Sequence, residues 1–188
     1  MALVLAIPAL AQTTGEQWEA ARRLPILDGE GLLGIRLGDA LPVIVHKLGP
    51  PGRSDPDNLR STMEHTWQYV GPNEDWQLGL SVRYTIGQTG ADAIHMLALR
   101  RNSTMPFPYL GRTRRGYAVG EGVERLHALY GAPDRTFTLP ATAPRWSWYR
   151  AAGLVVSVPV QGNYQATQIA VLRPNISADE AYRLLLGQ

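Results

Sequence analysis

The most constraining feature of this sequence is a pattern that occurs twice, 82 residues apart. The stretch GDALPVIVHKLGPP occupies positions 38–51, and GEGVERLHALYGAP occupies positions 120–133. In both stretches apolar residues recur every three or four positions, which is the spacing of one face of a helix. Both end on a glycine followed two residues later by a proline. This pair stops a helix, because glycine adopts positive φ readily and proline lacks the N–H that would continue the hydrogen bonding. The sequence therefore predicts two equivalent short helices.

The match continues beyond the two helices. The further matching segments are 66–70 with 145–149, 78–86 with 152–160, and 95–101 with 168–174. They alternate apolar and polar residues, which is the period of half-buried strands. The offset between copies falls from 82 to 79, 74 and 73 along the chain, so the second copy has shorter loops. We expect an α+β protein of two tandem repeats, each a helix or helix pair packed on a three- to four-stranded antiparallel sheet.

The repeats also set the expected organisation of the chain. In order, we expect a signal-peptide remnant at 1–11, an N-terminal helix and loop at 12–33, repeat 1 at 34–103, a linker rich in arginine and proline at 104–115, repeat 2 at 116–174, and a short C-terminal helix at 175–188. Units of this size bury a smaller fraction of their surface than larger domains do when they stand alone. We therefore expect the two sheets to join or to pack on each other.

The N-terminus predicts export. The apolar run MALVLAIPALAQ ends in Ala9-Leu10-Ala11, the A-x-A pattern of a secretory cleavage site, so the mature chain would begin near Gln12. A disordered apolar terminus or a strand is the alternative. The run is shorter than the ~20 residues of a membrane span, and the chain has no cysteine to carry a lipid. We expect a periplasmic or secreted protein with neither a membrane span nor a lipid anchor.

Composition excludes several kinds of chemistry. Because the chain has no cysteine, disulfides, thiolate metal ligands and cysteine nucleophiles are ruled out. Its net charge of +2 creates no field that would favour nucleic acid. The stretch GEGLLG at 29–34 matches the glycine pattern of dinucleotide-binding loops. No strong strand precedes it and no long helix follows, so we interpret it as a glycine-rich loop.

Candidate catalytic and metal-binding groups are sparse. The four histidines, His46, His65, His95 and His127, lack the spacing of metal ligands on one helix. Neither a G-x-S-x-G elbow nor a phosphate-binding G-K-[ST] loop occurs. The paired carboxylates at 55 and 57 and at 74 and 75 lie in turn-like segments, where such residues commonly serve the turn itself. We expect no catalytic residue, no metal and no cofactor.

The order of motifs resembles a known type of exported repeat. The residues that carry the resemblance are Gly38, Leu41, Leu48-Gly49-Pro50-Pro51, Trp67, Tyr69 and 79–84 in the first copy, and Gly120, Val123, Tyr130-Gly131-Ala132-Pro133, Trp146, Trp148 and Gly153-Leu154 in the second. The pattern is similar to the β-lactamase inhibitor protein family and to the small outer-membrane-assembly lipoproteins. The inhibitor resemblance implies two tandem units with helices on one side of a curved sheet, and an exported binding role.

This chain departs from both families. The lipoproteins need an N-terminal cysteine and the inhibitor units carry disulfides, whereas this chain has no cysteine. The inhibitors contact their enzyme through residues scattered over the concave sheet, and no motif carries those residues over to positions of this sequence. The resemblance therefore implies a protein-binding module and leaves its target open.

The expected function is that of a non-enzymatic, exported protein-binding module, either inhibitor-like or an envelope assembly or scaffold factor. Helices would cover one sheet face, and an open face would bind a protein partner. The side chains that would present themselves there are Gln68, Arg83, Thr85, Ser147 and Ser157. The alternative is a small hydrolase or a periplasmic protein that binds a small ligand, using His95 or loop carboxylates.

Aromatic and arginine residues supply further candidate contacts. Trp67 with Tyr69, and Trp146 with Trp148, match between the copies, so we expect each pair to contribute to the core. Trp76 and Tyr164 have no match and lie near loops, which makes them candidate exposed anchors. Arginine binds carboxylates and phosphates well, and the candidate arginine contacts are Arg112, Arg114 and Arg115. A solvated linker is the alternative interpretation of these arginines.

Overall fold

The computed structural model describes residues 8–56, 62–71, 73–100, 107–138, 145–157 and 165–186. Within them the chain forms four α-helices and one 3-10 turn: α1 (Pro8–Ala21), α2 (Leu41–Leu48), α3 (Val123–Tyr130), α4 (Ala178–Leu186) and η1 (Arg150–Ala152). The strands are β1 (Gly31–Leu32), β2 (Ile35–Arg36), β3 (Arg53–Pro56), β4 (Thr62–Val70), β5 (Trp76–Thr85), β6 (Ala93–Arg100), β7 (Arg135–Thr138), β8 (Arg145–Tyr149), β9 (Leu154–Ser157) and β10 (Gln165–Leu172).

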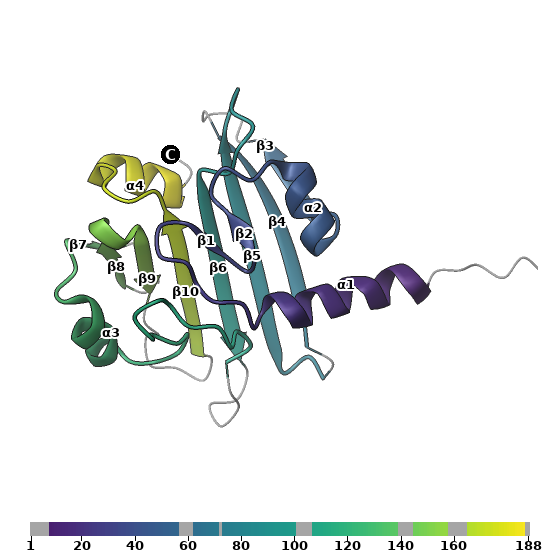
Figure 1. Ribbon diagram of the computed structural model, residues 1–188, viewed down its shortest axis with the longest axis horizontal. Helices are drawn as coiled ribbons and strands as arrows, with labels where there is room; N and C mark the ends of the chain where they lie inside the picture. The colour runs from purple at the N-terminus through teal and green to yellow at the C-terminus, as the bar shows by residue number, and fades with distance from the viewer. Residues whose placement is uncertain are drawn as a thin grey trace, which may run out of the picture.

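Eight of the strands form one antiparallel sheet in the order β3-β4-β5-β6-β10-β9-β8-β7 (Figure 1). Strands β6 and β10 meet at the centre of the sheet, where Ala93–Arg100 pairs with Gln165–Leu172. Strands β3–β6 therefore form a first half of the sheet and β7–β10 a second half. The predicted α+β class with an antiparallel sheet is confirmed.

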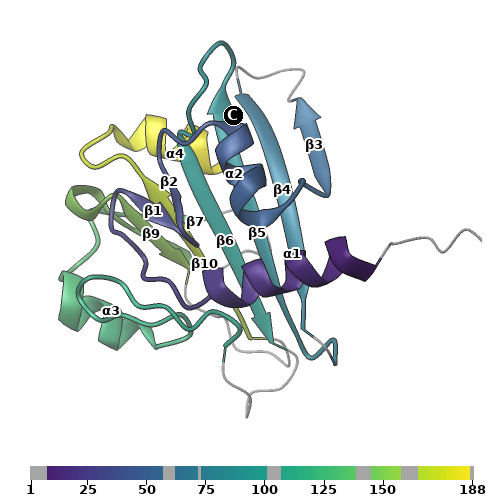
Figure 2. The same ribbon diagram turned by 45° about the vertical axis from the view of Figure 1, so that its right-hand side comes forward.

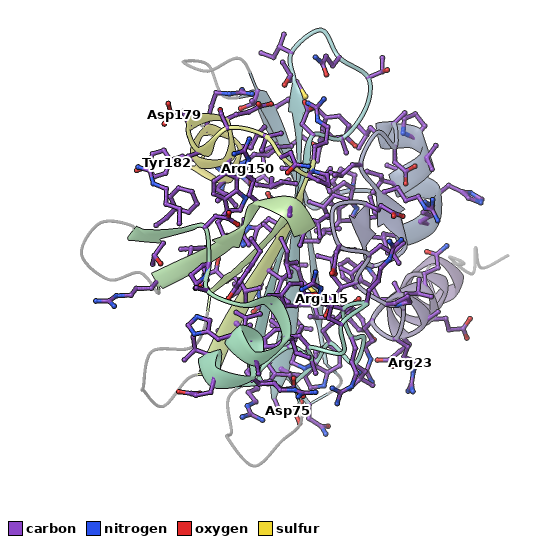
Figure 3. All side chains as sticks on the ribbon, turned by 60° about the vertical axis from the view of Figure 1, so that its left-hand side comes forward. Arg23, Asp75, Arg115, Arg150, Asp179 and Tyr182 are labelled. Atoms are coloured by element: carbon purple, nitrogen blue, oxygen red, sulfur yellow. The ribbon has the colours of Figure 1, made fainter. Side chains whose placement is uncertain are left out.

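The sheet has two faces, because successive strand residues point in opposite directions. The first, here called the helix face, packs against α1, α2 and α3. Its buried side chains include Trp67, Leu78, Leu80, Val82, Ile94, Met96, Ile169 and Val171. The second, here called the opposite face, packs against α4. Figure 2 shows α1 and α2 lying across β4–β6. Figure 3 shows α4 on the other side of the sheet from α1 and α2.

Helices α2 and α3 form where the repeated pattern predicts them. Ile44 and Leu48 of α2 are buried, and so is Leu126 of α3. Each helix ends at a glycine with positive φ, 83° at Gly49 and 81° at Gly131. The N–H of each glycine donates to the carbonyl four residues earlier at 2.8 Å. These stops are local features, so the sequence predicted them well.

Helix α1 begins at Pro8 and therefore runs through the predicted cleavage pattern Ala9-Leu10-Ala11. Its Trp18 is buried and stacks on Tyr69 of β4, with ring centroids 5.6 Å apart. Ala21, one turn further along, is also buried. This end of α1 thus belongs to the core of the helix face. None of the helices in the described part of the chain has both the length and the apolar character needed to cross a membrane.

The segment that follows β6 differs from the simple linker that we predicted at 104–115. From residue 107 onward it packs into the core of the helix face, where Phe107, Tyr109, Tyr117 and Val119 are buried. The Tyr109 hydroxyl donates to the carbonyl of Leu24, 85 positions earlier in the sequence. Aromatic residues in the segment, rather than its arginines and prolines, therefore decide where it lies.

The match of Trp67 with Trp146 is wrong in register. Trp67 is opposed to Leu80 and lies on the helix face. Trp146 is opposed to Ser157, and it packs with Trp148 in the cluster under α4. Side chains alternate along a strand, so an error of any odd number of residues in the match exchanges the two faces. All three tryptophans are buried, but the two pairs contribute to cores on different sides of the sheet.

Candidate functional site

The two halves of the opposite face differ in what packs on them. Over the second half, Ala181 and Leu184 of α4 pack with the apolar side chains Phe137, Trp146, Trp148, Val155, Ala170 and Leu172. On the first half the outward side chains are mainly polar. Among the described residues no helix packs over the middle of β4 and β5 on this face, and a hollow of about 550 Å³ lies there. We call it the sheet hollow.

One row of directly opposed residues crosses all eight strands on this face. In strand order it consists of Arg53, Thr66, Ser81, His95, Ala170, Val155, Trp148 and Arg135. The first four side chains line the sheet hollow. The next three are buried beneath α4. The chemical character of the face thus changes between β6 and β10, at the centre of the sheet.

Gly79 keeps the middle of the sheet hollow open, because it has no side chain to fill the space. It lies on β5 between Gln68 of β4 and Leu97 of β6, both of which line the hollow. A Cβ added at Gly79 would lie 3.7 Å from the Leu97 Cβ, which is an ordinary contact distance. The local backbone therefore does not require glycine. The lack of a side chain at this position leaves space above the strand.

A charged network borders the sheet hollow. The Ser81 hydroxyl donates to Glu64 Oε1. Arg83 Nη2 lies 3.4 Å from Glu64 Oε2, and Arg83 Nη1 donates to the main-chain oxygen of Leu184 at 2.7 Å. The Glu64 carboxylate is held by a hydroxyl and a guanidinium, and the same guanidinium contacts α4. Because these contacts hold both charged groups in place, the groups present a fixed arrangement of charge to any molecule that enters the hollow.

His95 lies half-buried in the wall of the sheet hollow. Its Nε2 is 2.9 Å from Gln168 Oε1 of β10, and its ring centroid is 5.3 Å from that of Trp146. The pKa of His95 is lowered to about 4, mainly by burial and also by the positive charge of Arg83, while the Gln168 hydrogen bond and Glu64 act in the other direction. The imidazole is therefore neutral at pH 7, and it serves as a hydrogen-bonding partner of the Gln168 amide.

Three of the five predicted open-face residues point to the opposite face and are accessible there. Gln68 is exposed and lines the sheet hollow. Arg83 points to the same face but is tied to Glu64 and to α4. Thr85 lies at the end of β5, paired with Thr62. Of these, Gln68 is the side chain most available to a partner.

The two predicted serines are placed differently. Ser157 points to the opposite face but is fully buried, and its hydroxyl accepts the N–H of Gln168 at 3.2 Å. Ser147 is opposed to Val156 and points to the helix face, where it is buried. The prediction that Ser147 lies on the open face is therefore wrong. Its strand is buried on both faces, so apolar and polar residues do not alternate in a way that reveals direction.

The two predicted aromatic anchors do not lie on the opposite face. Trp76 points to the helix face, where its ring meets Tyr69 at 5.4 Å between centroids. The Arg22 guanidinium lies 5.2 Å from the centre of the Trp76 ring. Trp76 is thus a half-buried packing residue rather than an exposed anchor. Tyr164 lies outside the described residues.

The three predicted arginine contacts are exposed, but each has a partner within the chain. The partners are Glu121 for Arg112 at 3.0 Å, Glu30 for Arg114, and the ring of Tyr130 for Arg115 at 4.9 Å. They belong to the segment that packs on the helix face, so the structure does not bring them to the sheet hollow. Figure 3 labels Arg115.

The sequence reasoning missed most of the lining of the sheet hollow. The overlooked side chains are Arg53, Glu64, Thr66, Gln77, Ser81 and Leu97. A usable signal existed in β4 and β5, whose polar positions alternate with buried apolar ones. Reading the polar side of both strands together would have gathered Glu64, Thr66 and Ser81. In the described part of the chain, no three His, Asp or Glu side chains are grouped so that they could hold a metal ion.

Comparison with known proteins adds one structural similarity. No protein-family model matches the chain, and no curated protein matches its sequence. Among solved structures, the chain is similar to the crystal structure of a DUF4309 family protein, YjgB, from Bacillus subtilis. The two share 13% sequence identity with a TM-score of 0.44, over 86% of this chain and 97% of the other.

Proposed function

We propose that this protein is an exported, non-enzymatic binding module that recognises a protein partner through the sheet hollow. The observation that carries the proposal is the unequal cover of the opposite face. Helix α4 packs on the apolar second half, while the polar first half keeps a hollow of about 550 Å³. A surface that is shaped, polar and not covered by the chain's own helix is suited to a partner.

The polar side chains of the sheet hollow lie among apolar surface, and this mixture favours a protein loop with both polar and apolar groups as the occupant. Gln68, Gln77 and Thr66 offer both donors and acceptors, and Glu64 offers a carboxylate. Interfaces between proteins that also exist separately are about as polar as the rest of the protein surface. A loop whose tip enters above Gly79 would meet these groups on all sides. Inhibition of an enzyme and assembly of an envelope complex are the two versions of this role.

We further propose that the two halves of the sheet are copies of one unit. The order α2-β3-β4-β5-β6 is repeated as α3-β7-β8-β9-β10, and the last strands of the two sets pair at the centre. The two helices are 82 residues apart in the sequence. When the same offset is applied to the strands, Trp67 matches Tyr149. Both lie on the helix face, opposed to Leu80 and Leu154 respectively. This arrangement supports the resemblance to the tandem inhibitor proteins.

The alternative, a small hydrolase, has its best candidates in the same hollow. Ser81 and His95 are directly opposed on β5 and β6. However, the Ser81 hydroxyl donates to Glu64, and His95 engages Gln168. A serine nucleophile needs its hydroxyl hydrogen-bonded to the base. The observed pairing therefore supports binding over hydrolysis.

The test is to fill the sheet hollow and measure partner binding. Gly79→Val adds a side chain that suits a strand, and its Cβ has room beside Leu97. Thr136→Val, at an exposed position of β7, is the matched control. A stoichiometric partner captured from envelope extract by the wild-type chain would be purified and titrated against all three proteins. We expect Gly79→Val to weaken binding at least about tenfold, as occluding a hot spot does, and the control to leave it unchanged.

Two results would contradict this proposal. One is the absence of any stoichiometric partner in extracts from which tagged chain is recovered folded. The other is a partner that binds Gly79→Val as tightly as wild type and protects amides outside β4–β6 from hydrogen exchange. Fractionation of cells that express a C-terminally tagged chain tests export separately.

A further inference from the structure

A second cavity lies on the helix face, away from the sheet hollow. Its volume is about 480 Å³, within the range of small-molecule sites. It is bounded by the start of α2, by the ends of β4 and β5 that pair near Thr62 and Thr85, and by the turn that follows β5. Figure 2 shows α2 lying over these strands. We call it the α2 cavity.

The lining of the α2 cavity is mainly apolar. Leu41 and Pro42 come from α2, Met63 from β4, and Ile86 from the turn. Ile86 is 59% exposed, although it is a large apolar side chain. Covering an apolar side chain that is exposed to water at the rim of a cavity lowers the free energy, so such a side chain favours binding. The walls therefore favour an apolar occupant.

Two buried polar side chains also face the α2 cavity. His65 and Tyr84 are each only 6% exposed, and their rings meet edge to face at 5.5 Å between centroids. His65 Nδ1 is paired with the Ser54 hydroxyl at 2.8 Å. The Tyr84 hydroxyl, in contrast, is buried without a hydrogen-bond partner in the described part of the chain. A buried hydroxyl without a partner is costly, so native proteins rarely leave one.

Two other buried tyrosines show how such a hydroxyl is satisfied, although the hydroxyl of buried Tyr149 also has no hydrogen-bond partner in the described part of the chain. Tyr109 donates to the carbonyl of Leu24, and Tyr117 donates to the carbonyl of Glu121 at 2.9 Å. Tyr84 is buried to a similar degree and lines the α2 cavity, but its hydroxyl pairs with no main-chain oxygen in the described part of the chain. The hydroxyl is thus a buried polar group without a partner in the wall of this largely apolar space, and an occupant could satisfy it.

We propose that the α2 cavity binds a small, neutral, mainly apolar molecule that carries one hydrogen-bonding group, such as a phenol or an alcohol, paired with the Tyr84 hydroxyl. The apolar body of the molecule would contact Leu41, Met63 and Ile86. Asp39 acts on the Tyr84 hydroxyl, but its charge is paired with Lys47 at 2.8 Å, so the apolar lining is what disfavours a carboxylate in the cavity. Burial, with that same charge, raises the pKa of Tyr84 to about 12, so its hydroxyl stays protonated and able to donate.

The experiment titrates the full chain with three probes of one shape: 4-methylphenol, toluene and 4-methylbenzoate. Binding is followed by NMR at the methyl groups of Met63 and Ile86. We expect saturable shifts, with 4-methylphenol bound roughly three- to tenfold more tightly than toluene, the equivalent of one net hydrogen bond. 4-Methylbenzoate should bind more weakly than 4-methylphenol.

Tyr84→Phe is the decisive variant. It keeps the ring and removes the unpaired hydroxyl, so it should fold with an undiminished melting temperature and bind both neutral probes alike. Tyr117→Phe is the matched control, because it removes a hydroxyl that has a partner. This control should lower the melting temperature and keep the preference for 4-methylphenol.

The proposal fails if wild type shows no saturable shift with either neutral probe. It fails equally if Tyr84→Phe retains the preference for 4-methylphenol over toluene. Tighter binding of 4-methylbenzoate than of 4-methylphenol would overturn the assignment of a neutral ligand.

Discussion

Arg83 of β5 donates a hydrogen bond from Nη1 to the main-chain oxygen of Leu184 in α4, across 2.7 Å. Its Nη2 lies 3.4 Å from the Glu64 carboxylate at the border of the sheet hollow. One side chain thus joins the helix that covers the second half of the opposite face to the polar group of the first half. The boundary between the covered and polar halves is therefore held by a specific contact.

Replacing Arg83 should loosen α4. Arg83→Met keeps much of the apolar stem and removes the guanidinium, so it eliminates both contacts. We expect the free energy of unfolding to fall by about 1.5–3 kcal/mol, the range for hydrogen bonds to charged groups. Urea denaturation measures the change, and faster hydrogen exchange confined to α4 would locate it. Arg23→Met, at an exposed position, is the control. Equal stability of the two variants would contradict the assigned role of Arg83.

Stability should decrease below pH 6.5 because of His95. Its folded-state pKa of about 4 lies below the ordinary value of 6.5. As the pH falls from 6.5 to 4, the unfolded chain binds the proton and the folded chain does not. The contribution of His95 to the free energy of unfolding is thus complete above pH 6.5. It declines as the pH falls to about 4 and does not change further below that.

The matched variants for this pH dependence are His95→Gln and His46→Gln. His95→Gln should lose less stability than wild type between pH 6.5 and 4. Exposed His46 is the control, and its substitution should leave the wild-type profile. Some slope should remain in His95→Gln, because burial also lowers the pKa of His65. Parallel profiles for wild type and His95→Gln, measured by denaturation across this range, would exclude the predicted shift.

Asp92 should be important for the turn that joins β5 and β6. It is 4% exposed, and its carboxylate accepts the Thr85 N–H at 2.7 Å and pairs with Arg173 at 3.0 Å. Asp92→Ala leaves the Thr85 N–H without this acceptor, so we expect a loss of about 1–3 kcal/mol in the free energy of unfolding. Glu16→Ala, at an exposed position of α1, should change stability by less than about 0.5 kcal/mol. Thermal or chemical denaturation distinguishes the two outcomes.

Adjacent residues of β5 should respond very differently to truncation. Leu78 is fully buried on the helix face, whereas Gln77 lines the sheet hollow. Leu78→Ala should cost about 2–5 kcal/mol, because it removes packed methyl groups and leaves a cavity. Gln77→Ala should cost less than about 1 kcal/mol, since its side chain is not part of the apolar core. Comparable losses in urea denaturation would show that the assignment of faces is wrong.

Local features were the most predictable part of this fold. Helices α2 and α3 follow from apolar spacing and from glycine stops with positive φ, and both features lie within a few residues. Strand β5 follows from strict alternation, since one of its faces is buried and the other lines a hollow. Such patterns depend only on the local backbone and on burial of one side.

The missed features depend on contacts between distant segments. Strand β8 is buried on both faces from Trp146 to Tyr149, so its sequence does not reveal which way Ser147 points. Trp76 is near a loop in the sequence, but Tyr69 and Arg22 pack around it. The exposure of these side chains was therefore unpredictable without the neighbouring elements.

The sequence by itself determined the α+β class, two helices with their stops, and the alternation of the long strands, because each arises from short-range periodicity and backbone preference. Only the tertiary structure decided where α4 docks, since its apolar side chains, including Ala181 and Leu184, could cover any apolar surface of suitable shape. That choice buries the second half of the opposite face and leaves the sheet hollow on the first half. The location of the candidate site thus follows from long-range packing, which local patterns do not record.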